Sequence, residues 1–360
     1  MNVTRERTRI RKYVNIKPFL AVLLLGTAAA VLLLGTAGTS IGSSPALAEQ
    51  SVTDGSPLHP SSVGSSCSRY YVISYIGPYN NPFMPVVERG VNFAGQKFRI
   101  PVAFEGPETL SVPDEAALLR SAIASHPCGL AVLLADPTAL DAPILQAERD
   151  HIPVTLWNVQ DFTPHGGPIS QLAYVGQDET LSGAKLATHL LPHLYRGEQG
   201  VYAVDFAGEI VAQFRYNGIK HTLAQHGISL SELTIGSNPT SEVSTLASYL
   251  AGHPKVKFIV SNGAPASVGV VTYIVHNHLA GKYVIASFDM TPTIAQAIKT
   301  GVQLFSLDQQ PFLQGFYAVA NIYFAHEYGF TPVNVNTGTL FVDRSNVNVF
   351  MRLTSEGIGA

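Results

Sequence analysis

A regular alternation of short apolar runs and amphipathic segments, which begins near Arg69, constrains the fold of this chain most strongly. The apolar runs are rich in Val, Ile and Ala, and the segments between them are roughly 12 to 18 residues long, which suits helices. Strands that alternate with helices form parallel sheets whose faces the helices cover. We therefore predict an α/β fold.

The alternation divides into two series at a Pro- and Gly-rich turn over residues 163–169. In the first series, strands are predicted over residues 70–76, 98–104, 130–135 and 154–157, and helices over 82–97, 114–125 and 138–150. In the second series, strands are predicted over 172–175, 201–206, 233–235, 258–261, 284–288 and 304–307, and helices over 179–194, 210–226, 240–251, 266–280 and 293–300. Two such lobes place a cleft between them, and small-molecule sites occur preferentially in such clefts.

The first 48 residues do not share this pattern. A basic stretch is followed by the uncharged run 19–38 and by Ala46-Leu47-Ala48, the order of an export signal with its cleavage site. An uncleaved membrane anchor is the alternative, because about 20 apolar residues can span a bilayer. Either interpretation places the remainder outside the cytoplasm, in the periplasm or at the cell surface. Residues 49–67, rich in Ser and Pro, predict a flexible linker.

The charge of the chain excludes one class of partner. Residues 1–48 carry six of the 22 Lys and Arg residues and one of the 25 Asp and Glu residues, so the remainder has a net charge of about −8. A nucleic-acid-binding protein needs a basic face. We therefore expect no nucleic-acid partner.

The two cysteines, Cys67 and Cys128, each come just before a predicted strand. In an oxidising compartment they could form a disulfide, and they would lie within bridging distance if those two strands are neighbours. Two free buried thiols are the alternative.

Polar and aromatic side chains follow several of the predicted strands, at the ends where parallel sheets bind small molecules. Asn, Gln and Asp supply the donors and acceptors that hydroxyl groups need, Arg can bind two neighbouring oxygens, and aromatic rings can cover the apolar face of a sugar. The pattern therefore favours a sugar or polyol ligand. The residues are Tyr79, Asn80, Asn81, Phe83, Trp157, Asn158, Arg215, Asn238, Asn262, Asp289 and Gln309.

Several of these residues also have a simpler structural interpretation. Asn and Asp before a helix commonly cap it, aromatic side chains are usually part of a core, and a lone Arg on a helix is often an exposed charge. These interpretations apply, in that order, to Asn80, Asn81 and Asp289, to Phe83 and Trp157, and to Arg215. The joint occurrence at strand ends, rather than any one residue, is the evidence for a site.

Two motifs of catalysis and cofactor binding are absent from the sequence, which has no GxxxxGK[ST] and no CxxC. His189 and His193 have the spacing of a metal-binding pair, but Pro192 interrupts the helix and no HExxH surrounds them. Zinc would need further ligands. We therefore predict no enzyme activity, no catalytic residue, no cofactor and no metal site.

From about Arg69 to Leu353 the chain resembles the type I periplasmic-binding family, the ribose/galactose-like sugar receptors of ABC importers. The resemblance rests on NNPF at 80–83, ADPTAL at 135–140, IPVTLWN at 152–158, YVGQDE at 174–179, FRYNGI at 214–219, SNGAPAS at 261–267, SFDM at 287–290 and DQQPFLQG at 308–315. It implies two Rossmann-like lobes with parallel sheets that three crossing segments join and that close by a hinge motion. The expected lobes are 68–160 with 309–330 and 161–308 with 331–353, and the expected crossings lie near 158–162, 308–311 and 329–332.

The resemblance also implies which residues bind the ligand. Ribose-like receptors usually have an aspartate followed by an arginine where this chain has Asn158-Val159, which argues against ribose itself. The implied ligand-binding residues are Asn81, Phe83, Met84, Asn158, Arg215, Asn262, Asp289 and Gln309, and the further candidates are Tyr79, Asn80, Asp136, Trp157 and Asn238.

A member of this family would be a monomeric receptor that delivers a monosaccharide or polyol to an ABC permease and its ATPase. The alternative is an extracellular sensor that presents its bound ligand to a signalling receptor. Repressors of the lactose-repressor type share the fold, but they need a helix-turn-helix before the first lobe, where this chain has its apolar export segment.

Overall fold

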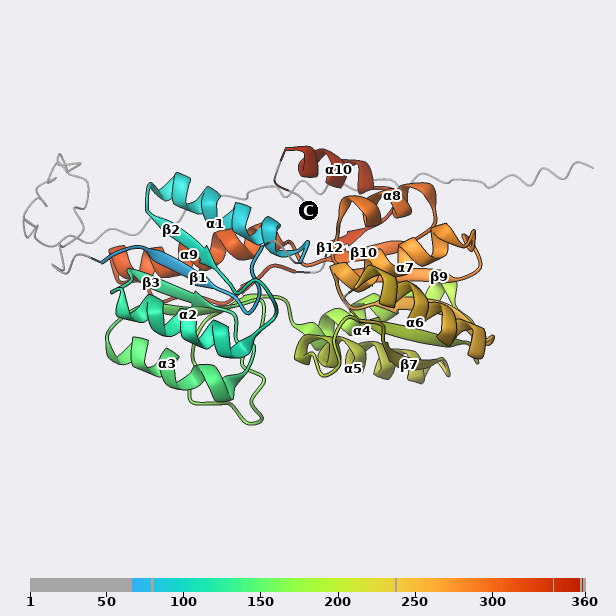
Figure 1. Cartoon of the computed structure of the whole chain (residues 1–360), viewed down its shortest axis with the longest axis horizontal. Coiled ribbons are helices and arrows are strands. Elements are labelled where there is room, and N and C mark those ends of the chain that lie inside the picture. Colours follow the sequence, from blue (N-terminus) through green and yellow to red (C-terminus); the bar gives the residue numbers. More distant parts are fainter. Residues whose placement is uncertain (1–66, 79–80, 237, 339, 357, 359–360) are drawn as a thin grey trace, which may run out of the picture. The chain divides into compact units, whose positions relative to one another are not determined.

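The computed structural model describes residues 67–360 apart from 79–80, 237, 339, 357 and 359–360. The predicted export signal and nearly all of the predicted linker lie outside the described residues, as do the candidates Tyr79 and Asn80. The described chain forms two α/β lobes (Figure 1), which confirms the predicted fold class.

The first lobe is built on a six-stranded parallel sheet with the strand order β11-β5-β4-β3-β1-β2. Its strands are β1 (Tyr70–Ile73), β2 (Val102–Glu105), β3 (Gly129–Val132), β4 (Val154–Trp157), β5 (Tyr174–Gly176) and β11 (Val335–Asn336). The helices α1 (Met84–Phe98) and α9 (Pro311–Tyr328) pack together on one face, and α2 (Val112–Ala124) and α3 (Pro137–Arg149) pack together on the other. The predicted strand over 98–104 begins only at Val102, because α1 continues through Phe98 and ends at Arg99 in the left-handed conformation.

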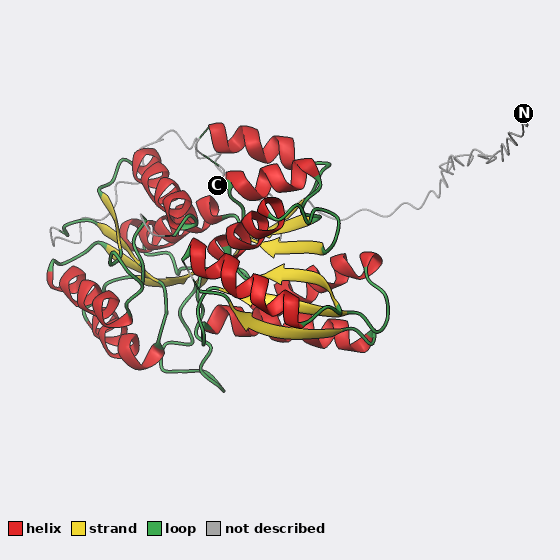
Figure 2. Ribbon diagram, turned by 45° about the vertical axis from the view of Figure 1, so that its right-hand side comes forward, coloured by secondary structure: helices red, strands yellow, loops and turns green. Residues whose placement is uncertain are grey.

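The second lobe is built on a six-stranded sheet with the order β12-β10-β9-β8-β6-β7, in which only the short β12 runs antiparallel to its neighbour. Its strands are β6 (Gln199–Val204), β7 (Ser229–Thr234), β8 (Val256–Ser261), β9 (Val284–Phe288), β10 (Phe305–Asp308) and β12 (Leu340–Val342). Its helices are α4 (Glu179–Leu190), α5 (Ile210–Gln225), α6 (Pro239–Gly252), α7 (Ala264–His276), α8 (Pro292–Thr300) and α10 (Val347–Ser355), with a single 3-10 turn η1 (Leu191–His193). Helices lie on both faces of the strands (Figure 2), so the inner strands β6, β8, β9 and β10 are buried almost throughout, whereas the edge strands β7 and β12 are largely exposed or half-buried.

Glycines bring α4 and α5 unusually close together. A Cβ atom on Gly183 would lie 2.2 Å from the carbonyl oxygen of Arg215, and one on Gly218 would lie 2.1 Å from that of Thr180. Real Cβ atoms do not approach backbone so closely, so both positions require glycine. This contact sets α5 against the start of α4 and thereby fixes the position of Arg215.

The crossings between the lobes differ from the prediction at two of three places. Because β5 pairs with β4, the chain stays in the first lobe until Gly176, and because β11 pairs with β5, it returns there before β12. The crossings are therefore residues 177–178, 309–310 and 337–338. The crossing predicted near 308–311 agrees with this topology, whereas those near 158–162 and 329–332, and the lobe boundaries at 161 and 331, are wrong.

The turn that misled the prediction is a local loop of the first lobe. The side chain of Asp161 accepts hydrogen bonds from the backbone N–H groups of Thr163 (2.9 Å) and Gly167 (3.1 Å). The Pro- and Gly-rich stretch thus folds back on itself and leads into β5, beside β4, rather than across to the second sheet.

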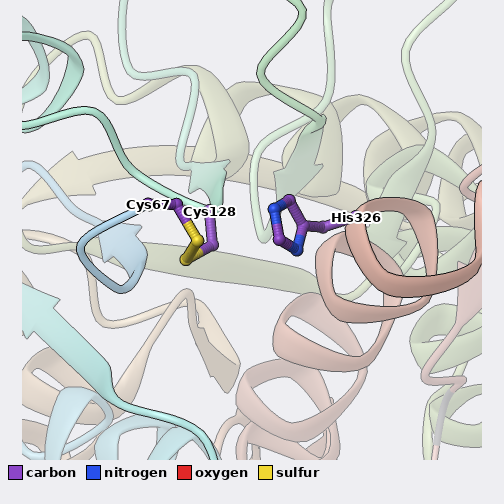
Figure 3. Close-up of side chains that lie close together, drawn as sticks. All are labelled: Cys67, Cys128 and His326. Carbon is purple, nitrogen blue, oxygen red and sulfur yellow. A yellow bond between two sulfur atoms is a disulfide. The ribbon is translucent and has the colours of Figure 1, made fainter. Parts of the chain in front are cut away.

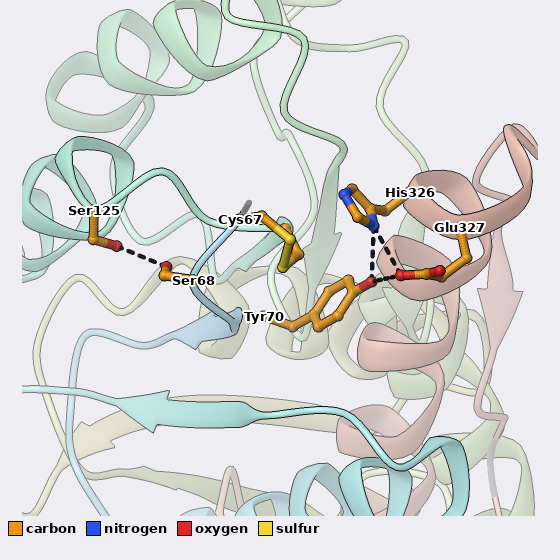
Figure 4. Close-up of a disulfide and its surroundings, with 7 residues drawn as sticks. Cys67, Ser68, Tyr70, Ser125, His326 and Glu327 are labelled. Atoms are coloured by element: carbon orange, nitrogen blue, oxygen red, sulfur yellow. Dashed lines mark hydrogen bonds and ion pairs between the residues drawn. A yellow bond between two sulfur atoms is a disulfide. The ribbon is translucent and has the colours of Figure 1, made fainter. Parts of the chain in front are cut away.

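The two cysteines are joined. Cys67 and Cys128 precede the neighbouring strands β1 and β3, and their disulfide has a Cα–Cα distance of 4.9 Å, within the usual range. His326 of α9 faces the bond (Figure 3). Beside it, the Tyr70 hydroxyl donates to Glu327 (2.9 Å) and lies 3.0 Å from Nδ1 of His326 (Figure 4), which ties the start of β1 to the end of α9.

Candidate functional site

A narrow cavity between the two lobes collects polar side chains from the ends of five strands. The first lobe lines it with Tyr75, Asn81, Phe83, Met84 and Asn158, and the second lobe and the second crossing line it with Asp205, Glu209, Val211, Arg215, Gly263, Ala264, Pro265, Asp289 and Gln309. Apart from Arg215 of α5, the polar side chains follow β1, β4, β6, β9 and β10, at the edge where open parallel sheets bind ligands. The cavity volume is about 40 Å³, which is room for a few water molecules.

Two residues of the site turn the chain sharply at a strand end. Asn158 after β4 and Asp289 after β9 have φ angles of 59° and 65°. Asn and Asp tolerate this left-handed conformation better than other non-glycine residues. The conformation ends each strand and leaves both side chains on the wall of the cavity.

Arg215 is held by a dense set of partners beneath the cavity. Its Nε and Nη2 donate to the two carboxylate oxygens of Glu179 at 2.6 and 3.2 Å, and Nη1 donates to the backbone oxygen of Asn262 at 2.5 Å. The guanidinium also lies over the ring of Phe288, 4.5 Å from its centroid. Burial alone would lower the pKa of Arg215, but Glu179 and then Asp289 raise it above its ordinary value, so the arginine is charged.

An amide network links the two lobes at the second crossing. The side-chain amide of Gln309 donates to Oδ1 of Asp289 at 2.7 Å. Its oxygen accepts from Asn158 (3.1 Å) and from Gln314 (3.1 Å), and Asn158 donates to Gln314 as well (3.0 Å). Gln309 thus joins a residue of the first lobe to a carboxylate of the second.

Three carboxylate side chains, those of Asp205, Glu209 and Asp289, form a cluster where α7 begins. The side chain of Asn262 donates to Oε2 of Glu209 (2.8 Å) and accepts from the backbone N–H of Asp205 (3.3 Å). The N–H of Ala264 donates to Oδ2 of Asp289 (3.1 Å). Asn262 therefore positions this group without lining the cavity itself.

Burial shifts the ionisation of these carboxyl groups upward. Burial raises the pKa of Glu209 to about 7, although Arg215 and Asn262 lower it. Burial and then the nearby Glu209 raise the pKa of Asp205 well above its ordinary value. The pKa of Asp289 is also raised by burial, against the opposing effects of Arg215, Gln309 and the N–H of Ala264. Near neutral pH the cavity can therefore gain or lose protons when its contents change.

The structure brings most of the predicted ligand-binding residues to one cavity. The residues of the predicted set that line it are Asn81, Phe83, Met84, Asn158, Arg215, Asp289 and Gln309, whereas Asn262 lies behind it. Three of the further candidates lie elsewhere. Asp136 and Asn238 cap α3 and α6, and Trp157 is fully buried in the core, where its N–H donates to the backbone oxygen of Ile73 (3.0 Å).

Sequence reasoning missed three polar residues of the cavity, Tyr75, Asp205 and Glu209, and it also missed Gly263. Asp205 was hidden because the predicted strand over 201–206 included it, whereas β6 ends at Val204. A shorter strand would have shown Asp205 and Glu209 as a polar strand end like the others.

Other clusters in the described part of the chain offer less. Cys67, Cys128 and His326 form the one group there with the spacing of metal ligands, but the two sulfurs are bonded to each other and so offer no thiolate. His189 stacks on Phe341, with the ring centroids 4.3 Å apart. Among the described residues, no helix has the length and apolar character needed to cross a membrane.

Comparisons with known proteins agree with this geometry. A family model described as a periplasmic binding protein domain matches residues 73–326. The chain is 28% identical over 287 residues to a xylose/arabinose-binding protein (XylF) of Sulfolobus acidocaldarius, covering 75% of this chain and 70% of that protein.

Solved structures of the same fold are also similar. A periplasmic sugar binding protein of Legionella pneumophila superposes with a TM-score of 0.69 at 26% identity, covering 75% of this chain and 98% of the other. A carbohydrate transporter of Acidothermus cellulolyticus 11B, solved in complex with myo-inositol, gives a TM-score of 0.69 at 25% identity, with 80% and 98% of the two chains covered.

Proposed function

Because this chain belongs to the periplasmic binding protein family, we propose that it is an extracytoplasmic receptor that binds a sugar or polyol between its lobes and delivers it to an ABC import permease. The observation that carries the proposal is the cavity itself, where amides of the first lobe and carboxylates of the second meet at the ends of five strands. Such a set offers the donors and acceptors that neighbouring hydroxyl groups require. The relatives named above as binding xylose, arabinose or myo-inositol support the same ligand class.

The cavity requires the lobes to move. A monosaccharide is several times larger than about 40 Å³, since small-molecule pockets usually measure roughly 300 Å³ or more. Entry therefore needs the lobes to separate about the three crossings, as in hinge closure of binding proteins. In the bound state, ligand hydroxyls would replace contacts such as the hydrogen bond from Gln309 to Asp289.

Hydrogen bonds between crossings connect the cavity with this hinge. The side chain of Gln310 donates to the backbone oxygen of Thr337. Gln314 donates to Oγ1 of Thr337 at 3.4 Å and to Gln309 at 3.1 Å. Gln309 of the second crossing is thus connected through Gln314 to Thr337 of the third crossing. A ligand that engages Gln309 would act on both crossings, which links binding to closure.

Calorimetric titration of the purified full-length protein with pentoses, hexoses and polyols tests the proposal. A sugar of the correct class is expected to bind reversibly without being converted, and Asp289→Asn is expected to weaken its binding at least tenfold. Asp136→Asn is the matched control, because Asp136 caps α3 outside the cavity. The proposal fails if no sugar or polyol binds to protein shown to be free of co-purified ligand, or if a bound sugar is turned over.

The N-terminal sequence supports export as part of the same proposal. A basic stretch, an apolar run and Ala46-Leu47-Ala48 precede the family domain. Mass spectrometry of the native protein is expected to find a chain that begins at Glu49. An intact N-terminus in the membrane fraction would instead indicate the anchored form.

A further inference from the structure

The cavity carries more negative charge than its one arginine can balance. Asp205, Glu209 and Asp289 line it, and Glu179 lies directly behind Arg215. Among the described lining residues, Arg215 is the only one with a cationic side chain. Its charge is committed to Glu179, because two of its nitrogens donate to that carboxylate and a third donates to a backbone oxygen.

Asp205 has an oxygen that is left without a partner. The residue is 6% exposed and lines the cavity, and its Oδ1 makes no hydrogen bond. The N–H of Ala266 approaches the carboxyl group from the first turn of α7. A buried carboxyl oxygen without a donor is costly, so a donor from a ligand would stabilise it.

Gly263 leaves space between two of the carboxylates. A Cβ atom there would lie 3.5 Å from Oδ2 of Asp205 and 3.6 Å from Oδ2 of Asp289. The backbone of Gly263 is extended, with φ of −159°, so its conformation does not require glycine. The absent side chain keeps a small volume open that both carboxylates face.

The N-terminus of α7 offsets part of the negative charge. Ala264 donates its N–H to Asp289, and the N–H of Ala266 approaches Asp205 and lowers its pKa, where the helix dipole favours anions. Glu209 lacks this support and accepts from the neutral amide of Asn262. A neutral sugar adds hydroxyl donors but no positive charge, so carboxyl protons would have to balance the site.

We propose that the ligand carries a protonated amino group, as in an aminated sugar or aminated polyol, and that this ammonium binds among Asp205, Glu209 and Asp289. The inference rests on the sugar-receptor function proposed above and narrows its ligand class. An ammonium has three donors, which matches the three carboxyl groups, while Asn158 and Gln309 serve hydroxyls. A single metal ion fits less well, because the only group of described residues with metal-ligand spacing lies at Cys67, Cys128 and His326.

Protonation gives the two ligand types opposite pH dependence. An ammonium binds better once Glu209 has lost its proton. A neutral sugar whose hydroxyl oxygens accept hydrogen bonds from protonated carboxyl groups binds worse once those protons are lost. Affinity for the amine is therefore expected to rise from about pH 6 to about pH 7, where such amines keep their proton. The titratable groups that interact electrostatically with Glu209 are Tyr75, Glu179, Tyr202, Asp205, Arg215 and Asp289.

Matched sets of charged and neutral ligands test the inference in calorimetric titrations of the full-length protein. The probes are D-glucosamine, D-galactosamine and D-mannosamine, each with its neutral parent hexose and its N-acetyl derivative, and 1-amino-1-deoxysorbitol with sorbitol. At least one amine is expected to bind ten times more tightly than its neutral counterparts. For a hexosamine these are the parent hexose and the N-acetyl derivative, and for 1-amino-1-deoxysorbitol the counterpart is sorbitol. Equal or tighter binding of the neutral counterparts throughout would overturn the inference and leave the sugar-receptor function standing, whereas binding of no probe and no other sugar would contradict both.

Two variants separate charge recognition from general damage to the cavity. Asp205→Asn and Glu209→Gln are each expected to lower the ratio of amine affinity to parent affinity at least tenfold. Asp136→Asn, which changes a helix cap outside the cavity, is the control and should leave the ratio unchanged. The inference also fails if Asp205→Asn weakens amine and parent equally in protein whose circular dichroism and melting temperature match the wild type.

Discussion

The two lobes meet at one cavity but supply it with different chemistry. The first lobe contributes neutral side chains, Tyr75, Asn81, Phe83, Met84 and Asn158, whereas every charged residue on the wall belongs to the second lobe. The second lobe therefore supplies the charge of the described cavity wall, and the first lobe supplies rings and amides. The same asymmetry extends below the surface, since the second lobe holds the buried ion pair of Arg215 with Glu179 and the first lobe holds the disulfide.

Breaking the ion pair is expected to have the largest effect. Arg215→Met leaves the carboxylate of Glu179, which is 1% exposed, buried without its partner. Removing one member of a buried pair typically costs about 3–5 kcal/mol. The free energy of unfolding in urea should fall by that amount for the second lobe. Removing both charges in Glu179→Leu with Arg215→Met should cost less than Arg215→Met alone, and an equal or larger loss would show that packing, not charge, is responsible.

Removing the disulfide is the corresponding test in the first lobe. The bond closes a loop of 61 residues, which corresponds to about 4 kcal/mol in the chain-entropy model. The double variant Cys67→Ser with Cys128→Ser should lose up to that amount of stability in urea, while sugar affinity stays as in the wild type. Wild-type protein in reducing buffer should behave in the same way. A marked loss of affinity would mean that the bond also shapes the cavity.

The two lobes also bury carboxyl groups that titrate in different ranges. Glu115 in the first lobe is fully buried with both oxygens unpartnered, and burial raises its pKa to about 9. Burial raises the pKa of Glu209 in the second lobe to about 7. A raised carboxyl pKa means that the folded state binds the proton more tightly than the unfolded state, so stability is highest below about pH 4.5 for these groups and falls as the pH rises to the folded pKa.

Comparing the pH dependence of two variants sharpens this difference. Glu209→Gln should flatten the fall in melting temperature between about pH 5 and 7, and Glu115→Gln should flatten it up to about pH 9. Thermal unfolding at several pH values measures both slopes. Unchanged slopes in both variants would mean that neither carboxyl group takes up a proton on folding.

The strand-end rule explains how much of this molecule could be predicted from sequence. It located Asn158, Asp289 and Gln309, because each follows an apolar strand that is easy to recognise. It failed for Asp205, since one apolar residue beyond it, Phe206, extended the predicted strand past its true end. Strand ends are set by pairing with neighbours, here β7 and β8, and a single sequence does not show that pairing.

The crossings were harder to predict because their sequence signal is weak. Residues 177–178 are a Gln-Asp pair between a three-residue strand and a helix, whereas the conspicuous Pro- and Gly-rich stretch proved to be a loop within one lobe. Likewise, β11 has only two residues. Elements this short gain their place from tertiary contacts, such as the N–H of Thr337 that donates to the backbone oxygen of Gly176 (3.0 Å). Their register is therefore a property of the folded sheet and not of local preference.

The smallest structural change that tests the role of the second lobe in ligand binding is one added methyl group. Gly263→Ala places it between Asp205 and Asp289, at contact distances that the fold tolerates, and the extended backbone accepts alanine. Stability should change little, but the methyl group occupies space that the ligand needs, which should weaken binding by roughly tenfold or more. Gly252→Ala is the matched control, because a Cβ atom there meets nothing within 4 Å. If titration calorimetry gives both variants wild-type affinity, the ligand does not occupy the volume between the two carboxylates.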